Sequence, residues 1–94
     1  MEITFDTEKN QSNLSKHGVS LSDAAQLDWD IAWTEPDDRH DYGEVREIGY
    51  APMKNDRLYC VVFTRRANGL RIISLRKANQ REFDYYVSKI DTAD

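Results

Sequence analysis

Apolar residues are densest in the stretch 58–79, where two runs rich in Val, Ile, Phe, Tyr and Leu flank the pair Asn68-Gly69. Side chains of this kind favour pleated, half-buried strands. Asn and Gly also tolerate the positive φ angles that a two-residue type I′ turn requires. The pattern therefore predicts a β-hairpin that turns at these two residues.

The residues after the hairpin predict a helix. Asn79, followed three residues later by Glu82, has the signature of a capping box. Apolar residues then recur at the i, i+3, i+4, i+7 spacing of an amphipathic helix. We expect this helix to lie on the sheet through Phe83, Tyr86, Val87 and Ile90.

The N-terminal half predicts shorter elements. Asp6 or Thr7 can cap a strongly polar helix that ends near His17, where Gly18 can adopt the left-handed conformation. Because this helix has little apolar surface, we expect its side chains to face water or a partner. The other expected elements are an edge strand around Ile3 and Phe5, a short helix from Ser20 to about Leu27, a strand over 28–33, an exposed acidic loop over 35–41 and a strand over 45–53.

Together these elements predict one α+β domain over residues 1–94. Two N-terminal helices and a C-terminal helix would pack around a twisted antiparallel sheet of about four strands. Cys60 is the only cysteine, so we expect it to be a small buried apolar residue rather than part of a disulfide or a zinc site. No stretch is apolar enough to span a membrane and the first residues lack a signal-peptide pattern, so we expect a cytoplasmic protein.

The formal net charge of −4 conceals a segregation of charge along the chain. Residues 23–47 carry nine acids and two bases, whereas residues 54–81 carry one acid and eight bases. Because salt screens charges over about 8 Å at physiological ionic strength, a partner responds to the local field rather than to the net charge. A nucleic acid is therefore a possible partner, and the chain could present separate basic and acidic surfaces.

A turn at Asn68-Gly69 would pair Arg65 with Ile72 and Phe63 with Ser74, and side chains would alternate between the two faces along each strand. This register predicts a sheet face with arginines, tyrosines and a hydroxyl side by side, which suits phosphate binding and base stacking. An alternative is that these arginines only solvate strand ends and protect edges against aggregation. The residues expected on this face are Tyr59, Phe63, Arg65, Ile72 and Arg76, extended by Arg46, Ile48 and Tyr50.

Several polar positions are candidates for proton transfer. His17 follows Lys16 at a helix end, and an imidazole can accept and donate protons at neutral pH. A lone histidine at this place can equally serve only to stabilise the helix dipole. Glu44 and Glu47 flank Arg46, so either acid could be a base or simply an ion-pair partner. The second histidine lies in the acidic loop, which is more typical of a solvated loop than of a metal site.

Segments spread over nearly the whole chain resemble the BrnT family, toxins of bacterial type II toxin–antitoxin systems. The most specific stretches are N-x-x-K-H-G at Asn13–Gly18 and R-I-I-S-x-R-K-A at Arg71–Ala78. The resemblance implies a compact RelE-like fold and a ribonuclease that needs no metal or other cofactor. It also implies neutralisation by a cognate BrnA-like antitoxin of ribbon-helix-helix type. The antitoxin would bind DNA, and the toxin would be connected to DNA only through it. The similar segments are Phe5–Lys9, Asn13–Ser20, Tyr42–Gly49 and Leu58–Glu82.

The polar positions that the resemblance implies fall on Lys16, His17, Arg46, Arg65, Arg76 and Lys77. The spacing from Arg46 to Ile48 is shorter than expected for the family, so Arg46 and Glu44 compete for one functional position. Our hypothesis is RNA cleavage by the RNA's own 2′-hydroxyl, with His17 or else Glu44 as the base and arginines around the phosphate. The alternatives are a non-catalytic RNA-binding or protein-interaction module, and a basic face that docks an acidic segment of the antitoxin. The candidate catalytic residues are Lys16, His17, Glu44, Arg46, Arg65 and Arg76, and the candidate RNA-binding residues are Lys77, Tyr59 and Arg71.

Overall fold

The sheet of this protein has five strands, and one of them runs parallel to its neighbour. The computed structural model describes residues 1–91, so the last three residues of the expected domain lie outside the described part. The strand order is β1-β5-β4-β3-β2; β1 pairs with β5 in parallel and the other neighbours pair antiparallel. The α+β class is confirmed, but the expected four-stranded antiparallel sheet is wrong. The elements are β1 (Glu2–Thr4), α1 (Thr7–His17), η1 (Leu21–Gln26), η2 (Trp29–Ile31), β2 (Trp33–Pro36), β3 (Glu47–Pro52), β4 (Leu58–Arg66), β5 (Gly69–Lys77) and α2 (Gln80–Asp91).

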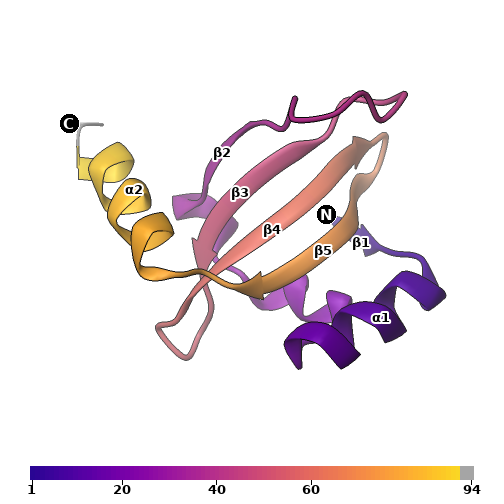
Figure 1. Cartoon of the computed structure of the whole chain (residues 1–94), viewed down its shortest axis with the longest axis horizontal. Coiled ribbons are helices and arrows are strands. Elements are labelled where there is room, and N and C mark those ends of the chain that lie inside the picture. The colour runs from indigo at the N-terminus through magenta and orange to yellow at the C-terminus, as the bar shows by residue number, and fades with distance from the viewer. Residues whose placement is uncertain (92–94) are drawn as a thin grey trace.

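The two faces of the sheet are covered differently (Figure 1). The 3₁₀ turns η1 and η2 lie behind the sheet in this view, α1 lies along the edge formed by β5 and β1, and α2 lies at the opposite end. We call the side that packs against η1 the core face and the other side the outer face. Each apolar side chain that the core face buries contributes about 1.5–3 kcal/mol. The largest fully buried side chains are those of Leu21, Val61, Phe63, Ile72 and Leu75, and all belong to this apolar core.

Helix α1 begins and ends as the sequence predicts. Asp6 accepts two hydrogen bonds from backbone N–H groups of the first turn, and Gly18, with a φ of 70°, ends the helix in the left-handed conformation. The burial along the helix was not expected. Leu14, its one clearly apolar residue, is half exposed, whereas Asn13 is buried. An aliphatic side chain therefore does not hold this helix in place.

The side-chain amide of Asn13 attaches α1 to the edge of β5. Its Nδ2 donates to the carbonyl oxygens of Leu75 (2.8 Å) and Val19 (2.9 Å), and its Oδ1 accepts from the N–H of Leu75 (3.2 Å). The amide takes the place of a neighbouring strand along the part of β5 that β1 does not cover, since β1 pairs only with Gly69–Arg71. A polar helix can pack on a sheet edge in this way because every buried amide group finds a partner.

Two elements expected between α1 and the sheet differ from the prediction. The short second helix lies where it is expected and Ser20 caps it, but it is the 3₁₀ helix η1 rather than an α-helix. The strand expected over 28–33 is replaced by η2, and β2 begins only at Trp33. The indole N–H of Trp29 donates to the carbonyl of Ala24 (3.0 Å), and its ring meets Phe63 edge to face with the centroids 5.4 Å apart. These contacts hold the segment over the core face instead of in the sheet.

The β4–β5 hairpin turns one residue earlier than predicted, at Ala67 and Asn68. Arg66 pairs with Gly69, and neither turn residue has a positive φ, so the predicted type I′ turn is wrong. Gly69 serves another purpose. A Cβ at this position would collide with the backbone of Glu2, so a glycine is what allows β1 to approach β5.

A β-bulge reverses the faces of the second half of β5. Phe63 pairs with Ile72, but the residue before Phe63 in β4 pairs with Ser74, so Ile73 is an extra residue in β5. Residues beyond the extra one point to the side opposite to that given by strict alternation. Arg76 consequently lies on the outer face, and the prediction that it shares a face with Phe63 and Ile72 is wrong.

Helix α2 begins with the expected capping box. The N–H of Asn79 donates to Oε1 of Glu82 (2.9 Å), and the N–H of Glu82 donates to Oδ1 of Asn79 (2.8 Å). The hydroxyl of Tyr86 ties the helix to η2 by donating to the carbonyl of Ile31 (2.7 Å). The expected apolar face is buried only in part, since Tyr86 is buried while Phe83 is exposed. None of the helices in residues 1–91 is long and apolar enough to cross a membrane.

Candidate nucleic-acid interface

Two arginines lie on the outer face on either side of the buried residue Thr64: Arg71 of β5, and Arg46 directly before β3. Thr64 pairs with Arg71 across β4 and β5, and its hydroxyl donates to the carbonyl of Val45 (2.8 Å), directly before Arg46. Asp37 continues the pairing of β2 with β3, because its N–H donates to the carbonyl of Arg46 (2.8 Å). One row of outer-face side chains therefore crosses the sheet, in the order Asp37, Arg46, Thr64 and Arg71.

The bulge adds two further polar residues of β5 to this face. Strict alternation would separate Arg71 from Ser74 and Arg76, but the extra residue puts all three on one side. Arg76 pairs with Cys60, whose thiol is buried as expected and has its pKa raised by that burial to about 11. We use the name outer-face cluster for Asp37, Arg46, Thr64, Arg71, Ser74 and Arg76.

The first turn of α2 holds Arg76 in place. Two nitrogens of its guanidinium group donate to the two carboxylate oxygens of Glu82, each at 2.8 Å. Glu82 is also the acid of the capping box, so one carboxylate fixes both the helix start and the arginine. The bonds from Arg76, and then that from Asn79, lower the pKa of Glu82. The Arg76 side chain is 35% exposed, so its guanidinium group is oriented and still accessible to a ligand.

Arg46 is more enclosed than Arg76. Its side chain is 17% exposed, its guanidinium carbon lies 4.0 Å from the ring centroid of Tyr42, and its Nη2 lies 3.8 Å from a carboxylate oxygen of Glu44. Glu44 also pairs with Arg66 at 3.4 Å. The buried Nε of Arg46 has no hydrogen-bond partner among residues 1–91. Because a buried N–H without a partner costs about 1–3 kcal/mol, Arg46 carries a donor that its surroundings do not satisfy.

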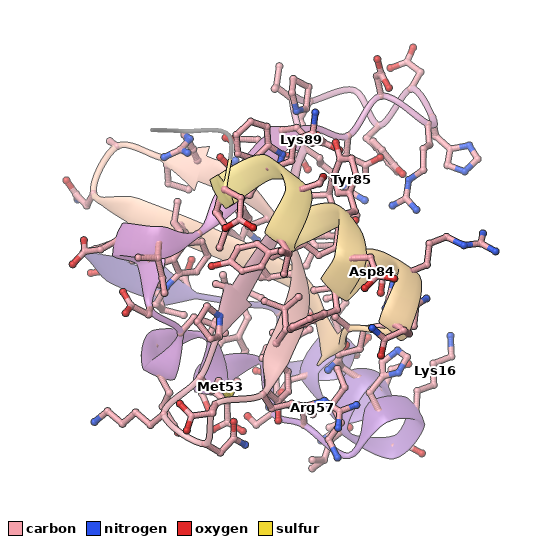
Figure 2. All side chains as sticks on the ribbon, turned by 90° about the vertical axis from the view of Figure 1, so that its left-hand side faces the viewer. Lys16, Met53, Arg57, Asp84, Tyr85 and Lys89 are labelled. Carbon is pink, nitrogen blue, oxygen red and sulfur yellow. The ribbon has the colours of Figure 1, made fainter. Side chains whose placement is uncertain are left out.

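Lys16 and His17 line a shallow hollow of about 180 Å³ between α1 and β5. Ser74 lines the same hollow, so the helix end and the outer-face cluster adjoin at this serine. Figure 2 shows the Lys16 side chain reaching from α1 toward the side of the molecule that faces the viewer in Figure 1. The other residues that line the hollow are Lys9, Ser12, Asn13 and Ile73.

Three of the predicted site residues project from the core side of the sheet. Tyr59 is only 5% exposed and belongs to the apolar core, so the prediction that it shares a face with Arg76 is wrong. Lys77 pairs with Tyr59 and therefore projects from the same side of the sheet. Arg65 also projects from that side, where it forms an ion pair with Glu47. The sheet therefore lies between these three residues and the arginines of the outer-face cluster.

The acidic and basic segments of the chain pair with each other. Arg65 pairs with Glu47 and Arg66 pairs with Glu44, so acids of the segment 23–47 neutralise arginines of the hairpin. Exposed pairs of this kind contribute only about 0–1 kcal/mol each. The pairs do, however, cancel part of the local positive charge. The expectation of separate acidic and basic surfaces is therefore wrong at the end of the sheet where Arg65 and Arg66 lie.

Sequence reasoning missed a buried ion pair in the loop expected to be exposed. The Asp37 side chain is 1% exposed and accepts from Nε (2.7 Å) and Nη2 (2.8 Å) of Arg39, which lowers the pKa of Asp37. The expectation that residues 35–41 bury nothing is therefore wrong. The signal in the sequence, an aspartate two residues before an arginine, is too common to identify such a pair. Within residues 1–91, no group of three His, Cys, Asp or Glu side chains is arranged to hold a metal ion.

Comparisons with known proteins identify the family and a solved structure of similar fold. Residues 5–82 match the sequence model of a family described as the ribonuclease toxin BrnT of type II toxin–antitoxin systems. The crystal structure of the Brucella abortus ribonuclease toxin BrnT is similar, with a TM-score of 0.67 and 26% sequence identity. The similarity covers 85% of the present chain and 99% of the Brucella chain. None of the curated proteins matches the sequence.

Proposed function

Because this chain belongs to the BrnT family of ribonuclease toxins of type II toxin–antitoxin systems, we propose that it is an endoribonuclease that cleaves RNA on the outer face of its sheet. Family membership implies an RNA substrate and a protein antitoxin as partner. The observation that carries the proposal is the bulge at Ile73, which gathers Arg71, Ser74 and Arg76 on the face of Arg46. Strict alternation would instead divide Arg71 and Arg76 between the two faces.

The proposed reaction uses the 2′-hydroxyl of the RNA and no metal ion. The 2′-oxygen gives its proton to a base and forms a bond to the adjacent phosphorus, while the bond from phosphorus to the 5′-oxygen breaks. The 5′-oxygen then takes up a proton, so the products are a 2′,3′-cyclic phosphate and a 5′-hydroxyl. Negative charge grows on the phosphate oxygens in the transition state, and a fixed donor aimed at such charge is worth about 10²–10³ in rate.

Arg46, Arg71 and Arg76 are the proposed phosphate ligands. A guanidinium group presents parallel N–H donors that match two phosphate oxygens. Glu82 already orients Arg76, so this side chain loses little freedom when RNA binds. The unpaired buried Nε of Arg46 supports a role in which the ligand supplies the missing acceptor or shifts the side chain toward one.

Proton transfer is assigned to the hollow between α1 and β5. His17 is the proposed base, and Lys16 beside it is proposed to support the leaving oxygen, because both line the hollow that Ser74 shares with the outer-face cluster. Glu44 is the second candidate for the base. Its contacts with Arg46 and Arg66 favour a role as an ion-pair partner.

The partner is proposed to be a BrnA-like antitoxin of ribbon-helix-helix type that contacts DNA itself. The support for this is the resemblance of the segments at 13–20 and 71–79 to the toxin family. In this arrangement the toxin is connected to DNA only through its antitoxin.

Digestion of a labelled RNA and of its 2′-deoxy counterpart in the presence of EDTA tests the proposal. We expect the RNA to be cut to fragments that end in a 2′,3′-cyclic phosphate and the deoxy substrate to stay intact. EDTA should leave the rate unchanged, since the scheme needs no metal. Cleavage of the deoxy substrate, or complete loss of activity in EDTA, would contradict the scheme.

A non-catalytic RNA-binding module is the second candidate function. The observation in its favour is that acids already engage several of the arginines, with both carboxylate oxygens of Glu82 bound to Arg76. Arginines neutralised in this way would give modest affinity and no turnover. Substitution of Arg76, described below, separates the two candidates.

A further inference from the structure

We propose that Arg39 is a further RNA contact of the outer face and that the buried Asp37 positions it for a backbone phosphate. This inference rests on the proposed function and adds a residue that neither the sequence motifs nor the family comparison single out. Its basis is an asymmetric ion pair: the side chain of the acid is 1% exposed and that of the base is 62% exposed. An ordinary surface pair leaves both partners in water.

The backbone fixes the place of Asp37 on the sheet. Its N–H donates to the carbonyl of Arg46 (2.8 Å), which adds one more pair to the β2–β3 ladder. Its side chain therefore lies on the same face as those of Glu35 and Trp33 of β2, which pair with Ile48 and Tyr50. This is the outer face, next to Arg46.

Arg39 is held next to Arg46 at one edge of the outer face. Its Nε and Nη2 are both bound to the Asp37 carboxylate, and Asp37 pairs with Arg46, whereas the Nη1 of Arg39 has no acceptor within residues 1–91. The exposed guanidinium group therefore adds a further cation to the row of outer-face residues that begins with Asp37 and Arg46.

Stability alone does not account for the buried Asp37–Arg39 pair. A carboxylate taken out of water is costly unless a partner compensates it, and replacing the pair by apolar residues would often be neutral or stabilising. What the pair adds is an arginine held in one orientation with donors left over. Fixing the guanidinium group before binding reduces the entropy lost when it meets a phosphate.

A charge-neutral double variant tests the inference. Arg39→Ala alone would leave the buried Asp37 carboxylate without a partner, so Asp37→Asn is combined with Arg39→Gln, which keeps the net charge at −4. The control is Arg57→Ala, which removes an exposed arginine from the turn between β3 and β4, away from the outer-face cluster. Arg39→Lys keeps the charge and removes only the paired donors. Thermal unfolding confirms that each variant is folded.

Binding of a 2′-O-methyl RNA oligonucleotide, which cannot be cleaved by the proposed route, is measured against salt concentration. One lost phosphate contact should lower the slope of log K against log salt by about 0.7. We expect this change and about a tenfold loss of affinity in the double variant, a smaller loss in Arg39→Lys, and values within about twofold of the parent in Arg57→Ala. In cleavage assays the double variant should raise KM more than it lowers kcat.

The outcomes separate this inference from the proposed function. If the parent cleaves RNA and the double variant binds with the parent slope, the pair is only structural and the inference is wrong. If Arg57→Ala weakens binding as much as the double variant does, general charge rather than a specific contact governs affinity, and the inference is again wrong. A parent that neither binds nor cleaves RNA would overturn both.

Discussion

The core face and the outer face are built from alternate residues of the same strands, yet they are organised by different interactions. The core face is covered by fully buried side chains such as those of Phe63 and Leu75, which belong to the main apolar cluster. The outer face carries arginines held by carboxylates, such as Arg76 with Glu82, and these arginines stay partly exposed. The outer face also buries a smaller apolar cluster under α2, which includes Tyr50, Cys60 and Tyr86. The main apolar core therefore lies on one side of the sheet, and most of the charged residues between its strands lie on the other side.

Truncation of a core-face side chain should have the largest effect. Phe63→Ala removes a fully buried ring that meets Trp29 edge to face, and we expect a loss of about 3–5 kcal/mol in the free energy of unfolding. Arg66→Ala, on the outer face of the same strand, should change it by less than about 1 kcal/mol. Urea unfolding followed by circular dichroism measures both. Equal losses would show that the two faces do not differ in their contribution to stability.

Arg76 and Arg65 form the sharpest pair for testing function. Both are arginines of the hairpin with a glutamate partner, but they project from opposite faces of the sheet. Arg76→Ala should lower kcat by about 10²–10³ because the phosphate loses a fixed donor. Arg65→Ala should change kcat by no more than a few-fold. Single-turnover cleavage of a labelled RNA, with its affinity measured separately, gives both values.

The same pair distinguishes an enzyme from a simple binder. In an enzyme, Arg76→Ala lowers turnover far more than it lowers RNA affinity. A parent that shows no turnover, together with a loss confined to affinity, would favour the non-catalytic module. A larger loss of kcat from Arg65→Ala than from Arg76→Ala would mean that RNA is cleaved on the core side of the sheet and not on the outer face.

The signals at the helix ends, which act within a few residues, are predicted correctly from the sequence, whereas the hairpin turn is not. The cap at Asp6, the left-handed Gly18 and the capping box of Asn79 with Glu82 are all present, because each depends on backbone groups only two to four residues away. The apolar hairpin was also identified. The family resemblance covers more of the chain than any single motif, since it extends over α1 and the hairpin to the first turn of α2.

Features set by distant contacts could not be predicted. The bulge at Ile73 leaves no mark in the alternating pattern of β5, and one unseen extra residue moved Arg76 to the other face. The asparagine of the N-x-x-K-H-G stretch, Asn13, hydrogen-bonds to Leu75, 62 residues away, so a residue of the family-like stretch serves to attach α1 to the sheet. Asp37 was judged from its polar neighbours, although its burial comes from pairing with Arg46.

The smallest expected effect is on acid stability, and it again concerns the outer face. Glu82 has its pKa lowered in the folded protein, chiefly by the hydrogen bonds from Arg76, and Asp37 has its pKa lowered by Arg39. A lowered pKa means that each carboxylate stabilises the fold above the pKa it has when unfolded, and that this contribution is lost as the pH falls through the folded value.

The ordinary pKa values are 4.5 for Glu82 and 3.8 for Asp37, so the melting temperature should be nearly constant from pH 7 to 5 and fall below about pH 4.5. Glu82→Gln should be less stable than the parent at pH 7 and should lose less on acidification, so that the two curves converge once the pH falls below the lowered pKa of Glu82. Parallel curves would show that the carboxylate which holds Arg76 contributes nothing to stability, and that Arg76 is oriented by something other than Glu82.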